Sequence, residues 1–393
     1  MRSNLIHVVV ASVAVVAIGM YAERGSGSTI APKNDVVTGA VERGAKWLVS
    51  VQGKDGGWGQ DGGETSYVRE GEHLESNGND VANTAVAVIA LLHATNYSEY
   101  RAVLRRAIDF ILQHVEHSPT EGLAVTDLTG TQIQRKLGPF IDTFLTSKVL
   151  AEVDGNMGDA RMNARVRQGL QKCVAKIEKN QLKDGSWNVA GGWAPILGTS
   201  MASRSLFIAQ QKGVVVSDAA MAKVDRYTKL QQQAQVRVGG SVGAIGSGSG
   251  GGTGLASMGA VYTASAGIPL YQDAQALEQL SRSDADRKKN ADQIKTITKR
   301  FASPQYIAGF GSIGGEEFFS YLNISDSLHR AGGPEWEKWN GEMKMKLIRL
   351  QNDDGTWAGQ HCITGRVAVT SAAILLLQAD RDAFLIPASA KKN

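Results

Sequence analysis

One seven-residue pattern occurs three times in the 393-residue chain, and it constrains the fold more than any other feature. The copies read QGKDGGW from Gln52, QLKDGSW from Gln181 and QNDDGTW from Gln351. All of them share the skeleton Q-x-x-D-G-x-W. Recurrence of such a skeleton within one chain predicts an internal structural repeat.

Each copy stands between two predicted helices. The segments before the copies, 41–51, 166–179 and 339–350, have apolar residues at three- and four-residue spacing, as amphipathic helices do. The Asp-Gly step then favours a helix end, because glycine accepts the left-handed conformation. The segments that follow, 80–94, 199–211 and 366–378, are apolar almost all round, so they must be covered on most sides.

The spacing between copies leaves room for further, less regular repeats. We expect outer helices at 99–117, 218–235 and 271–301, followed by inner helices at 137–153, 253–266 and 316–331. Inner helices would then begin near 80, 137, 199, 253, 315 and 366. A ring of such hairpins buries every inner helix and leaves no open repeat end. The sequence therefore predicts an all-α fold, a single α/α toroid of about six outer/inner helical hairpins over 36–382, with a tail at 383–393.

The first thirty residues predict export. Arg2 precedes an apolar run from Leu5 to about Met20, and the glycine- and serine-rich residues 25–28 follow. This pattern is typical of a signal peptide or an N-terminal membrane anchor with a flexible linker, so we expect a periplasmic or extracellular protein. The membrane would be contacted only through that anchor.

Net charge and cysteine content bear on the expected partners and on the redox state of the thiols. The formal net charge is +4, and no basic stretch is interleaved with aromatic residues, so nucleic acid is not an expected partner. Cys173 and Cys362 are the only cysteines, and they either pair in an oxidising compartment or remain buried free thiols.

The three tryptophan-bearing copies, each followed by a small-residue helix such as 84–87 or 370–373, resemble the terpenoid cyclase/protein prenyltransferase superfamily. Its squalene-cyclase (prenyltransferase/squalene oxidase) or QW repeats build an α/α toroid. The resemblance implies that the glutamine ends an outer helix and hydrogen-bonds to neighbouring backbone, while the tryptophan packs against it. The implied structural repeat residues are Gln52, Trp58, Gln181, Trp187, Gln351 and Trp357. This implies a fold and says little about chemistry.

The catalytic motifs of the superfamily are absent from the sequence. The string closest to the D-x-D-D acid of class II cyclases is Asp284-Ala285-Asp286-Arg287, in a charged segment expected to be exposed. Neither cysteine lies in the D-x-C motif with which prenyltransferases bind zinc. His361 and Cys362 could each ligate a metal, but the sequence names no third ligand, so no metal or cofactor is predicted.

Connection lengths indicate where a site would lie. The predicted outer-to-inner connections are long, whereas the inner-to-outer connections near 96, 155, 213, 267 and 332 are short. In an alternating ring the long connections share one rim, and functional groups commonly lie on such loops. Inner helices also begin at this rim, and helix N-termini favour negative charge. We therefore expect an unknown ligand there, anionic or isoprenoid.

Several residues near this rim are candidates for function. Glu316 and Glu317 either complement the dipole of an inner helix or act as a general acid. His361 and Cys362 are adjacent, and since an extended backbone turns neighbouring side chains apart, they are not expected to act as a pair. The i, i+3 pair His114 and His117 is expected to face solvent. The catalytic candidates are Glu317, Glu316, Asp142 and His361, and the binding candidates are Tyr321, Arg366, Trp193 and Asp127.

Three functions remain in competition. The first is a ligand- or partner-binding toroid without the family's D-x-D-D or zinc catalytic centre. The second is an isoprenoid-handling enzyme with a non-standard acid. The third is a carbohydrate-active hydrolase or lyase, which needs two carboxyl groups facing each other across a cleft. The sequence leaves open whether the protein is an enzyme.

Overall fold

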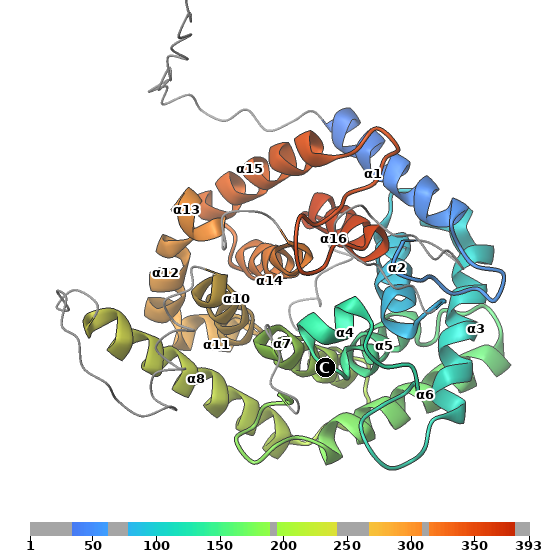
Figure 1. Cartoon of the computed structure of the whole chain (residues 1–393). Helices are drawn as coiled ribbons and strands as arrows, with labels where there is room; N and C mark the ends of the chain where they lie inside the picture. The colour runs from blue at the N-terminus through green and yellow to red at the C-terminus, as the bar shows by residue number, and fades with distance from the viewer. Residues whose placement is uncertain (1–33, 62–77, 189–194, 242–266, 309–313, 382–393) are drawn as a thin grey trace, which may run out of the picture.

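The computed structural model describes residues 34–61, 78–188, 195–241, 267–308 and 314–381, and the described part contains helices and no strands. The predicted all-α fold is confirmed. Figure 1 shows the helices in two concentric rings. The outer ring is formed by α1 (Asn34–Ser50), α3 (Arg101–His117), α6 (Ala160–Lys179), α8 (Asp218–Ser241), α11 (Asp284–Lys289), α12 (Ala291–Arg300), α13 (Pro304–Ile307) and α15 (Pro334–Leu350). The inner ring is formed by α2 (Val81–His93), α5 (Ile141–Val153), α7 (Pro195–Gln211), α10 (Gly267–Leu280), α14 (Gly315–Ala331) and α16 (Arg366–Leu377).

The inner ring is closed. Each inner helix packs against the next one along the chain, and α16 packs against α2. Nearly every residue of α2 and α16 is buried, which follows from their apolar sequence on all sides. The outer helix α3 buries only one stripe, with Leu104, Ile108, Ile111 and Val115 at three- and four-residue spacing. Hydrophobic periodicity thus assigns α2 and α16 to the inner ring and α3 to the outer ring.

The tryptophans of the three repeated patterns fasten each outer helix to the inner helix that follows. All three are buried. In each copy the indole N–H donates to a carbonyl oxygen ten residues earlier in the preceding outer helix, at 2.7 Å, the acceptors being Leu48, Ile177 and Leu347. The tryptophan backbone N–H donates to a threonine hydroxyl in the following inner helix, and these threonines are Thr84, Thr199 and Thr370.

The glutamines join each repeat to its neighbour. Gln52 Nε2 donates to Gly56 O in its own turn at 2.8 Å and to Val103 O in α3 at 3.0 Å. Gln181 makes the equivalent bonds to its own turn and to α8. Gln351 donates to Ala40 O in α1 at 2.9 Å, and so links the last repeat to the first. Gly56 must be glycine, because its φ is +94° and an added Cβ would lie 2.6 Å from Arg106 O.

Two predicted helix boundaries are wrong. Residues 271–280, predicted as part of an outer helix, belong to the inner helix α10, and the predicted inner helix at 253–266 lies outside the described residues. Residues 132–137 form a separate short helix, α4 (Gln132–Leu137), ahead of α5. Gly138, with φ +118°, separates the two helices, since only glycine adopts that conformation freely.

The outer-to-inner connections meet at one rim, here called the long-loop rim. Gln132 Oε1, in the second connection, accepts from Thr364 N at 2.9 Å and from Gly365 N at 3.1 Å, in the last one. Asp61, in the first connection, accepts from Arg366 N at 2.7 Å. Connections from inner to outer helices are short, such as 332–333 between α14 and α15. The short connections predicted near 96, 155, 213 and 332 are present, whereas the one predicted near 267 is wrong, because Gly267 begins α10 and the connection after α10 is at 281–283.

A small cavity lies among the inner helices. Residues of α2, α5, α7, α14 and α16 surround an apolar cavity of about 50 Å³. Beside it lies a buried ion-pair network in which Asp326 accepts from Arg204 at 2.5 Å and also pairs with Arg330. These pairs lower the pKa of Asp326 against the opposing effect of burial. The cavity and the ion-pair network thus lie side by side among the inner helices.

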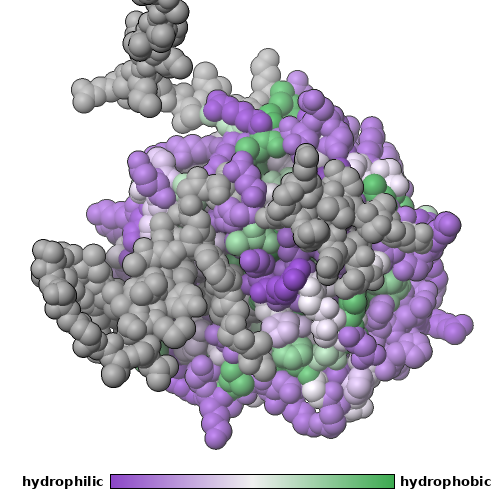
Figure 2. All heavy atoms as spheres, viewed as in Figure 1, coloured by the Kyte–Doolittle hydropathy of each residue, from purple (hydrophilic) through white to green (hydrophobic). Residues whose placement is uncertain are grey.

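Hydrophilic side chains dominate the outline of the molecule in the space-filling view (Figure 2). Within the described part of the chain, no helix combines the length and the apolar character that a bilayer span requires.

Candidate functional site

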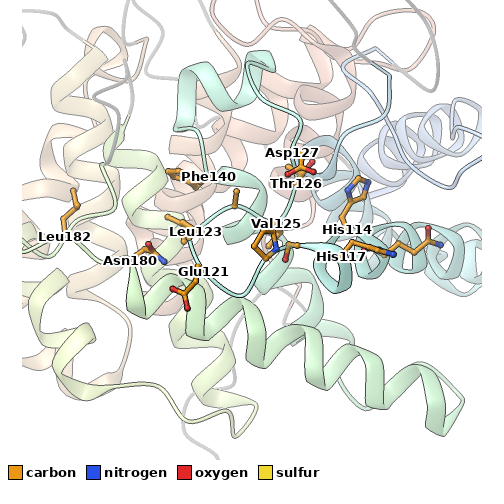
Figure 3. A pocket seen from close by; sticks show the side chains of 15 residues that line it. His114, His117, Glu121, Leu123, Val125, Thr126, Asp127, Phe140, Asn180 and Leu182 are labelled. Carbon is orange, nitrogen blue, oxygen red and sulfur yellow. The ribbon is translucent and has the colours of Figure 1, made fainter.

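A pocket of about 660 Å³ opens at the long-loop rim, where α3 and α6 end and α5 begins (Figure 3). The last turn of α3 and residues 118–127 form most of its wall, and Phe140, Asn180 and Leu182 complete it. We call it the rim pocket. Its volume falls in the range of small-molecule sites, about 300–1,000 Å³.

The rim pocket combines apolar and polar surfaces. Leu123, Val125 and Phe140 supply the apolar side, and His114 and Asp127 lie toward its other end (Figure 3). The ring of His114 packs on that of Phe110, with the centroids 4.7 Å apart, and burial lowers the pKa of His114. The prediction that His114 and His117 face solvent is only partly right, because both line this pocket and His114 is half-buried.

Two lysines of α6 hold the wall of the rim pocket in place. Lys172 Nζ donates to Val115 O at 2.8 Å and also bonds to Ser118 O. Lys176 is 2% exposed, and its Nζ lies 3.4, 3.1 and 3.0 Å from the carbonyl oxygens of Glu121, Gly122 and Ala124. These bonds satisfy both the ammonium groups and the backbone of an irregular loop. The pocket wall is therefore fixed and does not depend on a ligand.

Asp142 lies at the same rim but faces away from solvent. It is buried in the first turn of α5, where it accepts from Ala82 N at 3.1 Å and from Gln134 Nε2 at 2.7 Å. Burial and the nearby charge of Asp80 raise its pKa to about 7. Asp80 caps α2 by accepting from Asn83 N, and burial raises its pKa to about 6. The two carboxyl groups form a coupled pair that joins α2 to α5.

Glu317 is also a capping residue. It is buried, and its carboxylate accepts from Gly314 N at 2.9 Å at the start of α14. Tyr271 OH donates to it at 3.2 Å. Burial, reinforced by the charge of Glu316, raises the pKa of Glu317 to about 8. Its role at the start of α14 is therefore a hydrogen bond to the backbone, and the predicted complement to the helix dipole stays a prediction.

Glu316 meets His361 and Cys362 at the long-loop rim. The imidazole Nδ1 of His361 lies 3.5 Å from Glu316 Oε1, and the donor atoms of all three residues lie within 4.8 Å of one another. Contrary to expectation, the adjacent His361 and Cys362 side chains converge. Cys362 has a φ of +59°, so the backbone is not extended there. Burial, and then Glu316, raise the pKa of the Cys362 thiol to about 12.

The four predicted binding residues do not form one site. Asp127 lines the rim pocket. Arg366 begins α16 and pairs with Asp61 and Asp354. Tyr321 is buried and donates to Ile307 O at 2.9 Å. Trp193 lies outside the described residues.

Sequence reasoning missed several residues of these sites. Asp80 was visible only as the start of an inner helix, and its partner Asp142 is 62 positions away in the chain. Tyr271 lies in the helix that was assigned to the wrong ring. Lys176 occurs in an amphipathic helix as an ordinary charged residue, and nothing in its local pattern distinguishes it from exposed lysines. Both cysteines are free, Cys173 fully buried and Cys362 partly buried.

Comparison with known proteins supports the fold. Residues 27–135 match the family model of the squalene-hopene cyclase C-terminal domain. No curated protein gives a significant match to the chain. The matched segment contains the first repeated pattern and the hairpins around α2 and α3. This match and the closed double ring are consistent with the α/α-toroid fold of the terpenoid cyclase/protein prenyltransferase superfamily.

Proposed function

We propose that this protein is a toroid that binds a small ligand, or a side chain of a partner, in the rim pocket. The observation that carries the proposal is a pocket of about 660 Å³ whose wall is fixed by Lys172 and Lys176. A pre-formed concave site loses little conformational entropy on binding. The three Q-x-x-D-G-x-W copies serve this function as QW repeats, by building the rigid ring.

The lining of the pocket suggests the chemistry of the ligand. Leu123, Val125 and Phe140 suit an apolar face, and Asp127 and His114 suit hydroxyl or amine groups. Glu121 and Asp127 place carboxylates at the pocket. Glu121 is paired with Lys179, so the Asp127 carboxylate is the charge that disfavours the anionic ligand that the helix N-termini alone would suggest. We propose a neutral or cationic ligand with one apolar face, such as a sugar or an amphipathic amine.

The ring centre offers less support for an isoprenoid-handling enzyme. The cavity found among the inner helices has about 50 Å³, room for only a few water molecules. An isoprenoid chain is far larger. The superfamily's D-x-D-D acid is also missing from the sequence, and Asp284 and Asp286 lie in α11, which has no buried residues.

Saturation-transfer NMR on the full mature chain tests the binding proposal. The probes are neutral mono- and disaccharides and short amphipathic amines. Ala124 lines the pocket and uses only its backbone carbonyl to bind Lys176, so Ala124→Trp fills the pocket while leaving that bond in place. Val215→Trp is the matched control, because Val215 is 90% exposed between α7 and α8.

We expect saturation transfer to at least one probe in the wild type, and this transfer should be lost in A124W and kept in V215W. Equal transfer in both variants, or none in the wild type, would overturn the proposal.

One observation favours a second candidate, a carbohydrate-active hydrolase or lyase. Glu121 and Asp127 line the same pocket, and such enzymes use paired carboxyl groups. Reducing-end assays on soluble polysaccharides would detect the activity. Asp127→Asn should abolish this activity. Absence of activity in the wild type would exclude the hydrolase or lyase candidate and leave ligand binding as the only proposed function.

We also propose that the protein is exported, on the strength of Arg2 and the apolar run that follows it. Intact-mass measurement of the protein recovered from a bacterial envelope fraction distinguishes a cleaved signal peptide from a retained anchor. Recovery in the cytoplasm with an intact N-terminus would contradict export.

A further inference from the structure

A second site lies at the long-loop rim, apart from the rim pocket. Glu316 is in the first turn of α14, and His361 and Cys362 are in the connection that leads to α16. One carboxylate oxygen, one imidazole nitrogen and one thiol sulfur lie within 4.8 Å of one another. Among the described residues, no other His, Cys, Asp or Glu cluster of three meets this distance.

Glu316 is the residue that points to a ligand. Its side chain is 1% exposed, and neither carboxylate oxygen has a hydrogen-bond partner. His361 Nδ1 lies 3.5 Å from Glu316 Oε1. A buried carboxylate without hydrogen bonds is costly, and buried charges are normally paired or coordinate a metal. Its neighbour Glu317 shows the contrast, because that carboxylate accepts from Gly314 N and Tyr271 OH.

The backbone holds the three donors together by close packing of glycines. Gly315 N donates to Ile363 O at 2.9 Å, which fastens the start of α14 to the residue after Cys362. An added Cβ on Gly315 would lie 2.5 Å from Ile363 Cβ, and one on Gly314 would lie 2.7 Å from the His361 ring. The left-handed conformation of Cys362 turns its side chain toward the same point as that of His361. The site is therefore built by the fold and not by chance proximity of flexible side chains.

We propose that Glu316, His361 and Cys362 bind one Zn²⁺ ion. A mixed carboxylate, imidazole and thiolate set is typical of zinc, whereas magnesium and calcium prefer oxygen ligands alone. Bonds of about 2.0–2.3 Å require only a small inward movement of donors that already lie within 4.8 Å. His361 and Cys362 are partly exposed, which gives the ion a path from solvent.

Three protein ligands leave a fourth tetrahedral position, the arrangement of zinc sites that accept a water or an external ligand. None of the donors belongs to a D-x-C motif, and two of them are adjacent residues of one loop. The site is independent of the rim pocket, whose lining includes none of these residues.

Metal binding to the reduced full-length chain tests the proposal. Competition with a chromophoric chelator should show one Zn²⁺ per chain. Cobalt(II) should give a thiolate charge-transfer band in the near ultraviolet, which reports ligation by cysteine directly. Glu316→Gln, His361→Gln and Cys362→Ser should each weaken zinc binding by about tenfold or more, and Cys362→Ser should abolish the band.

Cys173→Ser is the matched control, because Cys173 is the other free cysteine and lies buried in α6. It should keep both the affinity and the cobalt band. Circular dichroism verifies that each variant is folded. Because Cys362 is partly exposed, Cys362→Ser should remain folded and testable even if Glu316→Gln unfolds the ring. Absence of zinc binding in the wild type, or a cobalt band that survives in C362S, would overturn the proposal.

Discussion

Asp80 serves as the N-cap of α2 while buried beside a second acid. The Asp80 carboxylate accepts from Asn83 N at 2.8 Å. Burial nevertheless raises the pKa of Asp80 from 3.8 to about 6 and that of Asp142 to about 7. The folded state therefore binds these protons more tightly than the unfolded chain. The stability they contribute is complete below about pH 4 and is lost as the pH rises through 6 to 7.

Replacement of Asp80 by Asn should reduce this pH dependence. Asn caps helices as well as Asp does, so the bond to Asn83 N is kept while the charge is removed. We expect D80N to match the wild type near pH 4 and to exceed its unfolding free energy at pH 8 by on the order of 1–3 kcal/mol. Urea denaturation at both pH values measures the difference. A loss of stability that is equal at both values would show that the charge is not involved.

Asp159→Asn supplies a control of opposite sign. Asp159 caps α6 at the surface, and its bonds to Met162 N and Arg105 lower its pKa. Its contribution is present above about pH 4 and lost below it, so D159N should be less stable than the wild type at pH 8. The two aspartates look alike in sequence, as N-caps before helices. Only the folded ring, which buries one and exposes the other, separates their behaviour.

At the scale of elements, the connection between α3 and α5 depends on lysines from a third element, α6. Lys176 replaces secondary structure as the partner for three backbone carbonyls of residues 121–124. The sequence predicts the length of this connection and the rim on which it lies. It does not predict the pocket, because the lysine that shapes the loop is more than fifty positions away and its helix has an ordinary amphipathic pattern.

Lys176→Met should loosen the pocket wall without opening the ring. Methionine keeps the apolar length but leaves buried carbonyls unpaired, at a cost of about 2–3 kcal/mol. Hydrogen exchange should rise in residues 118–127, while exchange in α2 and α16 should change only with the global stability. Lys179→Met is the control, since Lys179 forms an exposed pair with Glu121 and its loss should have little effect on stability. Equal effects of both substitutions would refute this role for Lys176.

Helix assignment succeeded where apolar periodicity was strong and failed where helices were irregular. The inner helices α2 and α16 are apolar on every side, and their ring position could be read directly. In contrast, α10 carries buried polar residues such as Gln272, Asp273 and Glu278, and α11 and α12 break the outer layer into short pieces. The convergence of Glu316 with Cys362 could not be predicted either, because it depends on a left-handed cysteine.

At the scale of the whole molecule, α16 completes a ring in which no inner helix has a free side. Its neighbours are α14 and α2 in the inner ring and α1 and α15 outside it. Removal of this helix uncovers the apolar surfaces of α2 and α14 together. In a repeat protein, stability depends on such nearest-neighbour interfaces, and exposed interior repeats lead to aggregation.

Truncation before Arg366 should therefore abolish cooperative folding. We expect the shortened chain to lose its near-ultraviolet circular dichroism, to show no sharp unfolding transition and to elute as aggregates in size-exclusion chromatography. Truncation after Arg381 keeps α16 and should behave as the wild type does. A monomeric, cooperatively unfolding chain without α16 would show that ring closure is dispensable.

The hydrogen bond from Gln351 to Ala40 joins the end of the chain to its first helix, so the ring can close only after the last repeat has been synthesised. The ribosome makes α1 first, but α1 must wait for α15 and α16, which are made last, before its inward face is covered. Contacts between residues so far apart in sequence form slowly, and until then the apolar helices need protection from one another. A polypeptide that cannot complete its fold before its final segment is synthesised stays unfolded during synthesis. The unfolded state is the form in which a protein can pass through a translocation pore.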